Sequence, residues 1–361
     1  MSVGAKRSVY FDHVKLALIL LVVLGHTLSP LKDSHNVLTI WKWIYTFHMP
    51  LFVFINGYFS SLKKNPLEKC AHFFLLYVGM QILSTCCMLV FRFDNLFFGL
   101  WKPRFGLWYL VGLMLWTLLL PLTRRFSPAV LLSGSVALSL AAGYCSFVGP
   151  VLALSRVLFF FPFFLLGFYA KKLDPAKVSR FFRHPAWKLA AAGALCLLAL
   201  LLFHYGSRLP QDLFLAKTAY SRRLLALAGP AWLYRLGFYG AACLSGGAFL
   251  LLIPRRACPL SPLGQRTLAV YMGHLLVLDL FKDQIPLLAR ILPVPAIAAL
   301  ALMLAFTFCH PVFMRPLNWL MSLPLLSPQT SSFLSLRPAP LIKRLRHWRI
   351  LSRAQRMLRV R

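Results

Sequence analysis

Residues 10–26 read YFDHVKLALILLVVLGH, and residues 43–58 read WIYTFHMPLFVFINGY. In both stretches an apolar run is interrupted by few polar side chains, among them Asp12, Lys15 and His26 in the first and His48 and Asn56 in the second. A transmembrane helix needs about 20 predominantly apolar residues. Together with their apolar flanks, the two stretches therefore predict the first two members of a series of membrane helices.

The same pattern recurs along the whole chain. Of its 361 residues, 59% are hydrophobic and only 13% are charged. Soluble domains usually carry about twice that share of charged residues, which excludes an ordinary cytosolic enzyme. We predict an all-α polytopic transmembrane bundle with about ten spans, a membrane domain over residues 7–320, and a linker with a basic tail over residues 321–361. The predicted spans are residues 14–31, 41–62, 73–91, 107–122, 129–148, 151–170, 186–205, 236–253, 267–281 and 293–313.

The charge distribution predicts the orientation. Lys and Arg number 40 against 8 Asp and Glu, which gives a formal net charge of +32. If the spans alternate from a cytoplasmic N-terminus, most of these cations fall in cytoplasmic loops, as the positive-inside rule requires. We therefore expect both termini in the cytoplasm and the protein in the cytoplasmic (inner) membrane.

The C-terminal tail has its own pattern. Leu341, Leu345 and Trp348 recur at helical spacing within residues 341–361, which contain many Lys and Arg residues and no acidic one. This predicts a basic amphipathic helix on an anionic lipid surface, so the expected partner of these cations is lipid and not nucleic acid.

The first predicted helix carries its ionisable groups on one stripe. Lys15 and His26 are eleven residues apart, which returns to nearly the same face at a separation of roughly 16 Å along the axis. Ionisable side chains inside a bilayer are costly and mark functional sites. Lys15 and Arg7 would hold the phosphates of an acyl-CoA, while the acyl end of that molecule reaches His26. The alternatives are that Lys15 snorkels to the headgroups or pairs with Asp12.

His48 lies at a depth similar to that of His26 on the antiparallel neighbouring helix, beside Pro50. A lone membrane histidine usually serves as an interhelical hydrogen-bonding group. Two at matched depth, above a cation, favour general-base catalysis on a hydroxyl nucleophile instead. His26 and His48 are thus the predicted catalytic residues.

Three further residues are candidates for the acceptor or oxyanion site, namely Arg156, Asn56 and Trp108. Arg156 starts an apolar run, where it stabilises an oxyanion, binds the acceptor or holds helix positions. Trp108 either stacks on a sugar or belongs to an interfacial aromatic belt. His274 and Asp279 are predicted to make structural contacts, Asp279 with Lys282 three residues on.

The sequence predicts no metal site and no bound cofactor. The eight cysteines form no CxxC pair, and most lie inside apolar runs, which is typical of packing residues. Acyl-CoA is expected only as a co-substrate. The oligomeric state is unknown from the sequence.

These residues resemble a known family. The run from Phe11 through Lys15 to His26 resembles the first-helix signature of the acyltransferase family 3 membrane proteins, in which Arg or Lys is followed by ten residues and His. Residues 47–59 resemble the second-helix motif of that family, with Asn56 in place of the expected Ser before Gly57. Residues 107–110, 156–167 and 263–274 are similar to later landmarks. Among subgroups, the fucose 4-O-acetylase-like proteins are the most similar.

The resemblance implies a ten-helix enzyme that transfers an acyl group, usually acetyl from acetyl-CoA, to a carbohydrate hydroxyl. It implies that His26 is catalytic and that Lys15 is the first-helix basic residue. We therefore predict an O-acyltransferase acting on a lipid-linked or cell-surface glycan, either directly or through a transient acyl-histidine. A secondary transporter without acyl-transfer chemistry is the alternative.

Overall fold

A computed structural model describes residues 8–63, 65–92, 99–149, 151–174, 180–182 and 184–325 of the chain. The chain divides into two units, Met1–Ser322 and Leu323–Arg361, and all the helices described below belong to the first. Arg7 and the predicted amphipathic helix of residues 341–361 lie outside the described residues.

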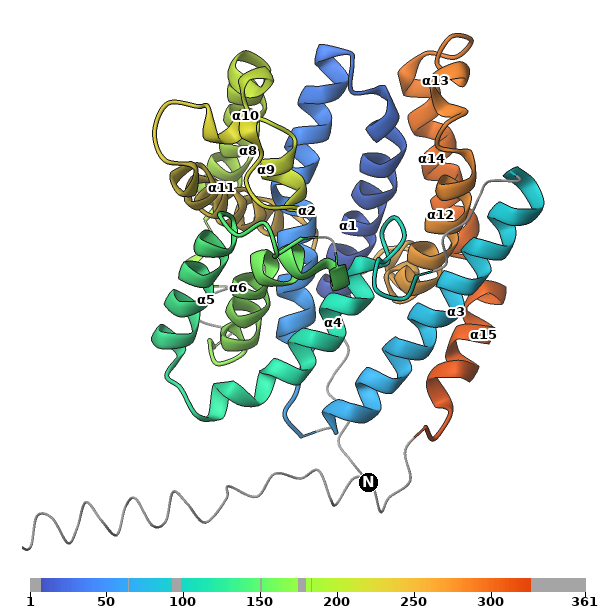
Figure 1. The fold of residues 1–361 in the computed structure, drawn as a ribbon, viewed down its shortest axis with the longest axis horizontal. Coiled ribbons are helices and arrows are strands. Elements are labelled where there is room, and N and C mark those ends of the chain that lie inside the picture. The colour runs from blue at the N-terminus through green and yellow to red at the C-terminus, as the bar shows by residue number, and fades with distance from the viewer. Residues whose placement is uncertain are drawn as a thin grey trace, which may run out of the picture. The chain divides into compact units, whose positions relative to one another are not determined.

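The described part of the chain is helical throughout, with no strand (Figure 1). The long helices are α1 (Val9–Leu28), α2 (His35–Phe59), α3 (Pro66–Arg92), α4 (Trp108–Leu119), α5 (Pro128–Ala142), α6 (Leu154–Ala170), α8 (Pro185–Tyr205), α11 (Ala231–Leu252), α12 (Thr267–Phe281), α14 (Val294–Phe308) and α15 (Pro311–Ser322). The short helices are α9 (Asp212–Leu215), α10 (Arg222–Leu225) and α13 (Ile285–Leu288). The 3-10 turns are η1 (Ser29–Leu31), η2 (Leu120–Arg124), η3 (Val151–Ala153), η4 (Gly206–Arg208) and η5 (Ser261–Gln265).

Each of the ten predicted segments overlaps one of these helices, so the all-helical prediction is confirmed. Among the described residues, six helices are long and apolar enough to cross a membrane, and a seventh span results if α14 and α15, bent by 54°, are taken together. Helices α4, α5 and α12 are apolar but shorter. The predicted number of about ten spans and the positions of the termini remain predictions.

Helices α1 and α2 form the centre of the bundle (Figure 1). α2 packs against α6, α8 and α11, whereas α1 packs against α12, α14 and η5. α2 continues through Pro50 to Phe59 as one helix. Several polar side chains of the two central helices are buried by this packing, among them Asp12, Thr46 and His48.

Two glycines allow α2 and α6 to approach closely. A Cβ atom at Gly57 would overlap the carbonyl oxygen of Phe164, and one at Gly167 would overlap the carbonyl oxygen of Phe54. Small residues at such crossings let helix backbones meet, and this packing is common in membrane bundles. The contact fixes the position of α6, and with it that of Arg156, relative to α2.

Candidate active site

Three histidines from three helices meet in the bundle. The ring of His26 on α1 lies 5.6 Å from the ring of His274 on α12, measured between centroids. His48 on α2 joins them through Tyr45, whose ring is 6.4 Å from His26 and 4.6 Å from His48. His26 is close enough to both other histidines for their charges to interact. The structure therefore brings the two predicted histidines together and adds His274, which the sequence had indicated only as a structural residue.

Hydrogen bonds fix the proton positions on two of the rings. Nδ1 of His48 lies 2.7 Å from the carbonyl oxygen of Ile44, and Nδ1 of His274 lies 2.7 Å from that of Val270. A carbonyl accepts only, so each Nδ1 carries the proton and each neutral ring keeps Nε2 as an acceptor. Within the described part of the chain, Nε2 of His274 is buried and has no hydrogen-bond partner.

His26 differs from the other two histidines. It is half-buried, and neither ring nitrogen forms a hydrogen bond with any residue that the structure describes. The preceding Gly25 faces Tyr45, since a Cβ atom there would lie 2.8 Å from the tyrosine ring. The missing side chain thus lets Tyr45 approach α1 directly beside His26. A general base needs a ring nitrogen that is available to the substrate proton and a side chain that is held in position by its neighbours.

Arg156 brings a cation to the histidines from α6. Its guanidinium carbon lies 4.9 Å from the centre of the Trp108 ring, and its Nε donates to the carbonyl oxygen of Leu215 at 3.1 Å. Its charge interacts with His26 and Tyr45. Among the side chains that the structure describes, no carboxylate lies within ion-pair distance of it. An arginine held in this way can bind an anion or a developing oxyanion.

Trp108 faces the inside of the bundle. Trp108 is only 7% exposed, and its ring stacks on Phe160 at 5.2 Å. It supports Arg156 from inside the bundle. Its neighbour Tyr109 is equally buried and accepts a hydrogen bond from Nδ2 of Asn56.

Asn56 belongs to a contact between helices. Its Nδ2 also donates to the carbonyl oxygen of Phe52 at 2.9 Å. The ring of Tyr109 lies 5.7 Å from that of Tyr271, which donates from its hydroxyl to Gly106 at 2.9 Å. This chain of contacts joins α2, α4 and α12, and no contact between Asn56 and the three histidines is found in the described residues.

Phe105 closes one side of the histidine cluster. Its ring lies 4.7 Å from that of His26, and its backbone is left-handed, with a φ of 40°. Such a conformation costs about 1–3 kcal/mol in a residue with a side chain and persists only where surrounding contacts enforce it. Lys282 covers the same ring at 5.6 Å.

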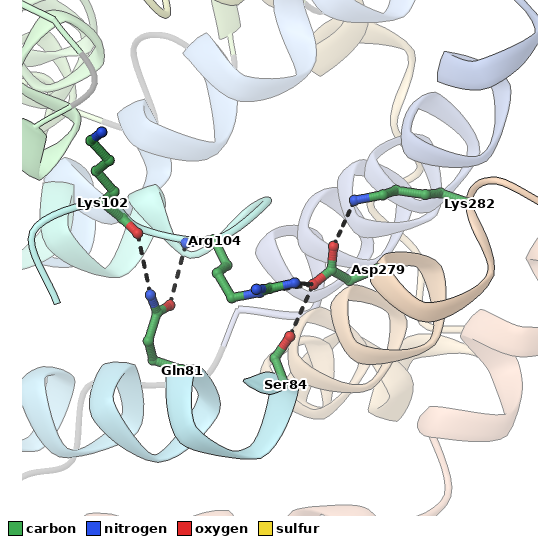
Figure 2. Close-up of polar contacts among 6 residues, drawn as sticks. All are labelled: Gln81, Ser84, Lys102, Arg104, Asp279 and Lys282. Atoms are coloured by element: carbon green, nitrogen blue, oxygen red, sulfur yellow. Dashed lines mark hydrogen bonds and ion pairs between the residues drawn. The ribbon is translucent and has the colours of Figure 1, made fainter. Parts of the chain in front are cut away.

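The surrounding contacts are those of a buried carboxylate, shown in Figure 2. Oδ2 of Asp279 accepts from Nε and Nη2 of Arg104 at 3.2 and 3.1 Å and from the hydroxyl of Ser84 at 2.9 Å. Oδ1 accepts from Lys282 at 2.9 Å, which is the predicted pair. Arg104 is adjacent to Phe105, so Asp279 ties the segment that carries Phe105 to α3 and α12.

Gln81 completes this attachment from α3 (Figure 2). Its amide nitrogen donates to the carbonyl oxygens of Gly99 and Lys102 at 3.1 and 3.2 Å, and its Oε1 accepts from the backbone nitrogen of Arg104 at 3.3 Å. Gln81 thus attaches the segment before α4 to α3.

Lys15 lies at the other end of α1. Its Nζ forms an ion pair with Oδ1 of Asp12 at 2.9 Å, and its side chain is 26% exposed. Arg255 is nearby, with its guanidinium 5.7 Å from the ring of Tyr10. The pairing alternative for Lys15 is therefore realised in the structure, and the binding of phosphates by Lys15 stays a prediction. Over the described ranges, no group of three His, Cys, Asp or Glu side chains is placed to hold a metal ion.

The fold and this site define a multi-pass membrane protein with a histidine cluster between its central helices. The family model described as an acyltransferase domain matches residues 8–313, which include every residue of the cluster. The chain therefore belongs to acyltransferase family 3, as its first two helices indicated.

Curated relatives support this assignment. The chain is similar to the nodulation protein NolL of Sinorhizobium fredii, with 28% identity over 222 residues, 55% of this chain and 59% of the relative. It is also similar to the nodulation protein NolL of Mesorhizobium japonicum, with 46% identity over 59 residues, 15% of this chain and 16% of the relative. The matched part is thus less than two thirds of either relative. No solved structure matches the chain.

Proposed function

We propose that this protein is a membrane-bound O-acyltransferase, which moves an acetyl or other acyl group from acyl-CoA to a hydroxyl of a cell-surface or lipid-linked glycan. The observation that carries the proposal is the position of His26 beside His274, Tyr45 and Arg156, with no hydrogen bond from its ring nitrogens to any residue that the structure describes. Membership in the family supplies the reaction class. The resemblance to fucose 4-O-acetylase-like proteins supports a sugar as the acceptor.

In the proposed reaction, His26 removes the proton of the acceptor hydroxyl while its oxygen attacks the thioester carbonyl. The negative charge that develops on the carbonyl oxygen lies against Arg156. When the tetrahedral intermediate collapses, the C–S bond breaks and the proton on His26 passes to the leaving thiolate. The products are the O-acyl glycan and free CoA, and His26 is neutral again.

The neighbouring histidines assist without accepting the substrate proton. Because Nδ1 of His48 and of His274 donates to a backbone carbonyl, each presents Nε2 as an acceptor. An acceptor beside a protonated imidazole stabilises the cation that His26 becomes. Trp108 holds Arg156, and Asn56 holds α2 against α4, so we assign positioning roles to both.

The donor reaches the site from the cytoplasm in this scheme. Lys15, with Arg7 as a second cation, binds the phosphates of the nucleotide at the inner end of α1. Lys15 already has Asp12 as a partner, so it would exchange one anion for another. The helix rise of roughly 16 Å between Lys15 and His26 suits the extended arm of CoA.

A secondary transporter is less well supported. Coupling to protons needs a carboxylate that is free to gain and lose a proton. In the described helices around the histidines, Asp279 is held by Arg104 and Lys282, and Asp12 is held by Lys15. Both carboxylates are thus neutralised by cations.

The test is acyl transfer by purified protein in phospholipid nanodiscs, with radiolabelled acetyl-CoA and a fucosylated oligosaccharide or a lipid-linked glycan as acceptor. We expect His26→Ala to lower kcat by about 10²–10⁴. The matched control is His204→Ala, since His204 is an exposed histidine of α8. Unchanged transfer by His26→Ala, at equal amounts of folded protein, would refute the mechanism.

A further inference from the structure

A cavity outside the histidine site lies beside α2. It has a volume of about 450 Å³, and its walls come from α2, α8, α9 and α11. These helices form one group beside α2 (Figure 1). Binding sites for small ligands are typically about 300–1,000 Å³ and mostly apolar. The histidine site does not use this space.

The lining of the cavity suits hydrocarbon. Leu198, Leu202, Leu213, Phe214 and Phe238 are among the apolar residues that form most of it, and no charged side chain of the described residues lines it. Two of its three hydroxyls are already engaged, because Thr46 donates to the carbonyl oxygen of Lys42 and Tyr234 donates to that of Ala228. A sugar in this cavity would lose its hydrogen bonds to water without replacement, whereas an alkyl chain would not.

Three cationic side chains lie around the turn η4, next to the cavity. The guanidinium of Arg208 lies 5.8 Å from the ring of Tyr205, which lines the cavity, and Arg223 donates to the carbonyl oxygen of Ser207 at 3.2 Å. Lys42, only 1% exposed, donates to the carbonyl oxygens of Gly206 and Leu209 at 2.5 and 2.7 Å. The charges of Arg223 and Lys42 interact.

This concentration of positive charge is unexpected from the orientation alone. In the predicted topology η4 lies on the outer side, where the positive-inside rule disfavours Lys and Arg. Asp33 and Asp212 are carboxylates nearby, and both interact with Lys32. An anionic ligand at the mouth would offset the repulsion between the cations, and phosphate is the group for which arginine is best suited.

The segment 212–216 is a shared wall between the cavity and the histidine site. Leu213 and Phe214 line the cavity, while the carbonyl oxygen of Leu215 accepts from Arg156. The wall ends at Ala216, whose φ of 48° is left-handed. A ligand held in the cavity is therefore separated from Arg156 by a single turn of backbone.

From these observations we infer that the cavity receives the hydrocarbon chain of the acceptor, a lipid-linked glycan whose phosphate lies against Arg208 and Arg223. The assignment of this lipid as the acceptor rests on the proposed function, whereas binding of a lipid phosphate does not. The chain anchors the acceptor, the arginines position its phosphate, and the sugar extends over the segment 212–216 toward His26.

The test uses the full chain in phosphatidylcholine nanodiscs with a long-chain alkyl phosphate that carries a diazirine at the end of its chain. Light should attach the probe to residues of α8 and α11 that line the cavity. Gly237→Phe fills the cavity and should lower the yield about tenfold. Gly240→Phe is the matched control, because Gly240 is also on α11 with nothing within 4 Å but does not line the cavity.

The arginines are tested with a second pair of probes. Combined Arg208→Gln and Arg223→Gln should lower labelling by the alkyl phosphate and leave labelling by the corresponding alcohol unchanged. Arg222→Gln, at an exposed neighbouring position, should leave both unchanged. If the phosphate and the alcohol respond alike, the phosphate site is refuted.

Equal labelling of the Gly237→Phe and Gly240→Phe proteins would mean a boundary lipid only and would overturn the inference. Gly237→Leu provides a smaller substitution if the phenylalanine variant does not fold. Gly237→Phe should also reduce acetyl transfer to a lipid-linked glycan but not to a water-soluble oligosaccharide. If His26→Ala transfers acetyl normally while the labelling pattern holds, the proposed function fails and the lipid site stands.

Discussion

At the scale of single residues, His48 and His274 share one hydrogen-bonding pattern that His26 lacks. Each of the two binds the carbonyl four residues earlier on its own helix through Nδ1. This places a proton on Nδ1 of both rings, so that each ring, when neutral, has Nε2 as an acceptor. The nitrogens of His26 form no hydrogen bond with any described residue and stay available to substrate. The difference assigns the proton transfer to His26 and a supporting role to the other two.

We predict that His274→Gln lowers kcat for acetyl transfer by about 10² and changes KM for acetyl-CoA little, because His274 stabilises the protonated form of His26. Steady-state kinetics on reconstituted protein measure both constants. A change confined to KM, or none, would contradict the assignment. His204→Ala serves again as the control, since it removes an imidazole from the exposed surface of α8.

At the scale of elements, the segment before α4 is held by one carboxylate. Asp279 accepts from Arg104, Ser84 and Lys282, and Arg104 leads directly into Phe105 beside His26. The segment is thus positioned by α3 and α12, two helices that are distant in sequence.

We predict that Asp279→Asn destabilises the protein by about 1–3 kcal/mol, because it leaves Arg104 and Lys282 without their counter-charge. Thermal unfolding in detergent measures the loss. Asp33→Asn, at an exposed carboxylate, is the matched control and should change the midpoint little. Equal midpoints for both variants would show that the contact contributes nothing to stability.

The crossing of α2 and α6 gives a second prediction at this scale. Gly57→Val should destabilise the fold by about 1–3 kcal/mol or more, because the side chain would overlap the backbone at Phe164. Gly240→Val adds the same side chain to open space on α11 and is the control. Detergent unfolding compares the two, and a Gly57→Val protein as stable as the control would contradict the crossing.

At the scale of the whole molecule, the described helices surround α1 and α2. The distribution of Lys and Arg between the loops predicts the orientation of the bundle in the membrane. In that topology His26 lies near the outer end of α1, His48 lies near the middle of α2, and Lys15 lies near the inner end of α1. A cytoplasmic donor and an outer acceptor would therefore approach from opposite sides.

The topology can be tested by cysteine labelling in a background without native cysteines. We predict that a membrane-impermeant maleimide labels Ser207→Cys in intact cells, and labels Ser127→Cys only after the membrane is opened. Both positions are exposed, which makes them a matched pair. The reverse pattern would invert the orientation and place the proposed acceptor site in the cytoplasm.

Much of the fold could be predicted from the sequence. Long apolar runs specify helices in lipid because every backbone group must be paired within its own segment. The approximate positions of all ten predicted segments follow from this constraint. The ends of the helices and the lengths of the spans could not be predicted as well. Helices α4, α5 and α12, for example, are shorter than a bilayer requires.

The candidate site was predicted only in part. His26 and His48 lie on consecutive helices, so their depth could be compared from the sequence. His274 could not be paired with His26 in this way, and Phe105 lies in a segment without a periodic pattern. Tyr271 and His274 belong to the residues that resemble a family landmark, which was the available signal.

The sequence alone determined that the chain is a helical membrane protein of acyltransferase family 3 with an ionisable stripe on its first helix. These properties depend on local composition and on spacing along one helix, which a linear pattern preserves. Only the tertiary structure decided that His274 and Phe105 surround His26, that Asp279 holds the segment beside them, and that a cavity lies beside α2. Such contacts depend on how helices far apart in the chain rotate and pack, and no local pattern encodes that rotation.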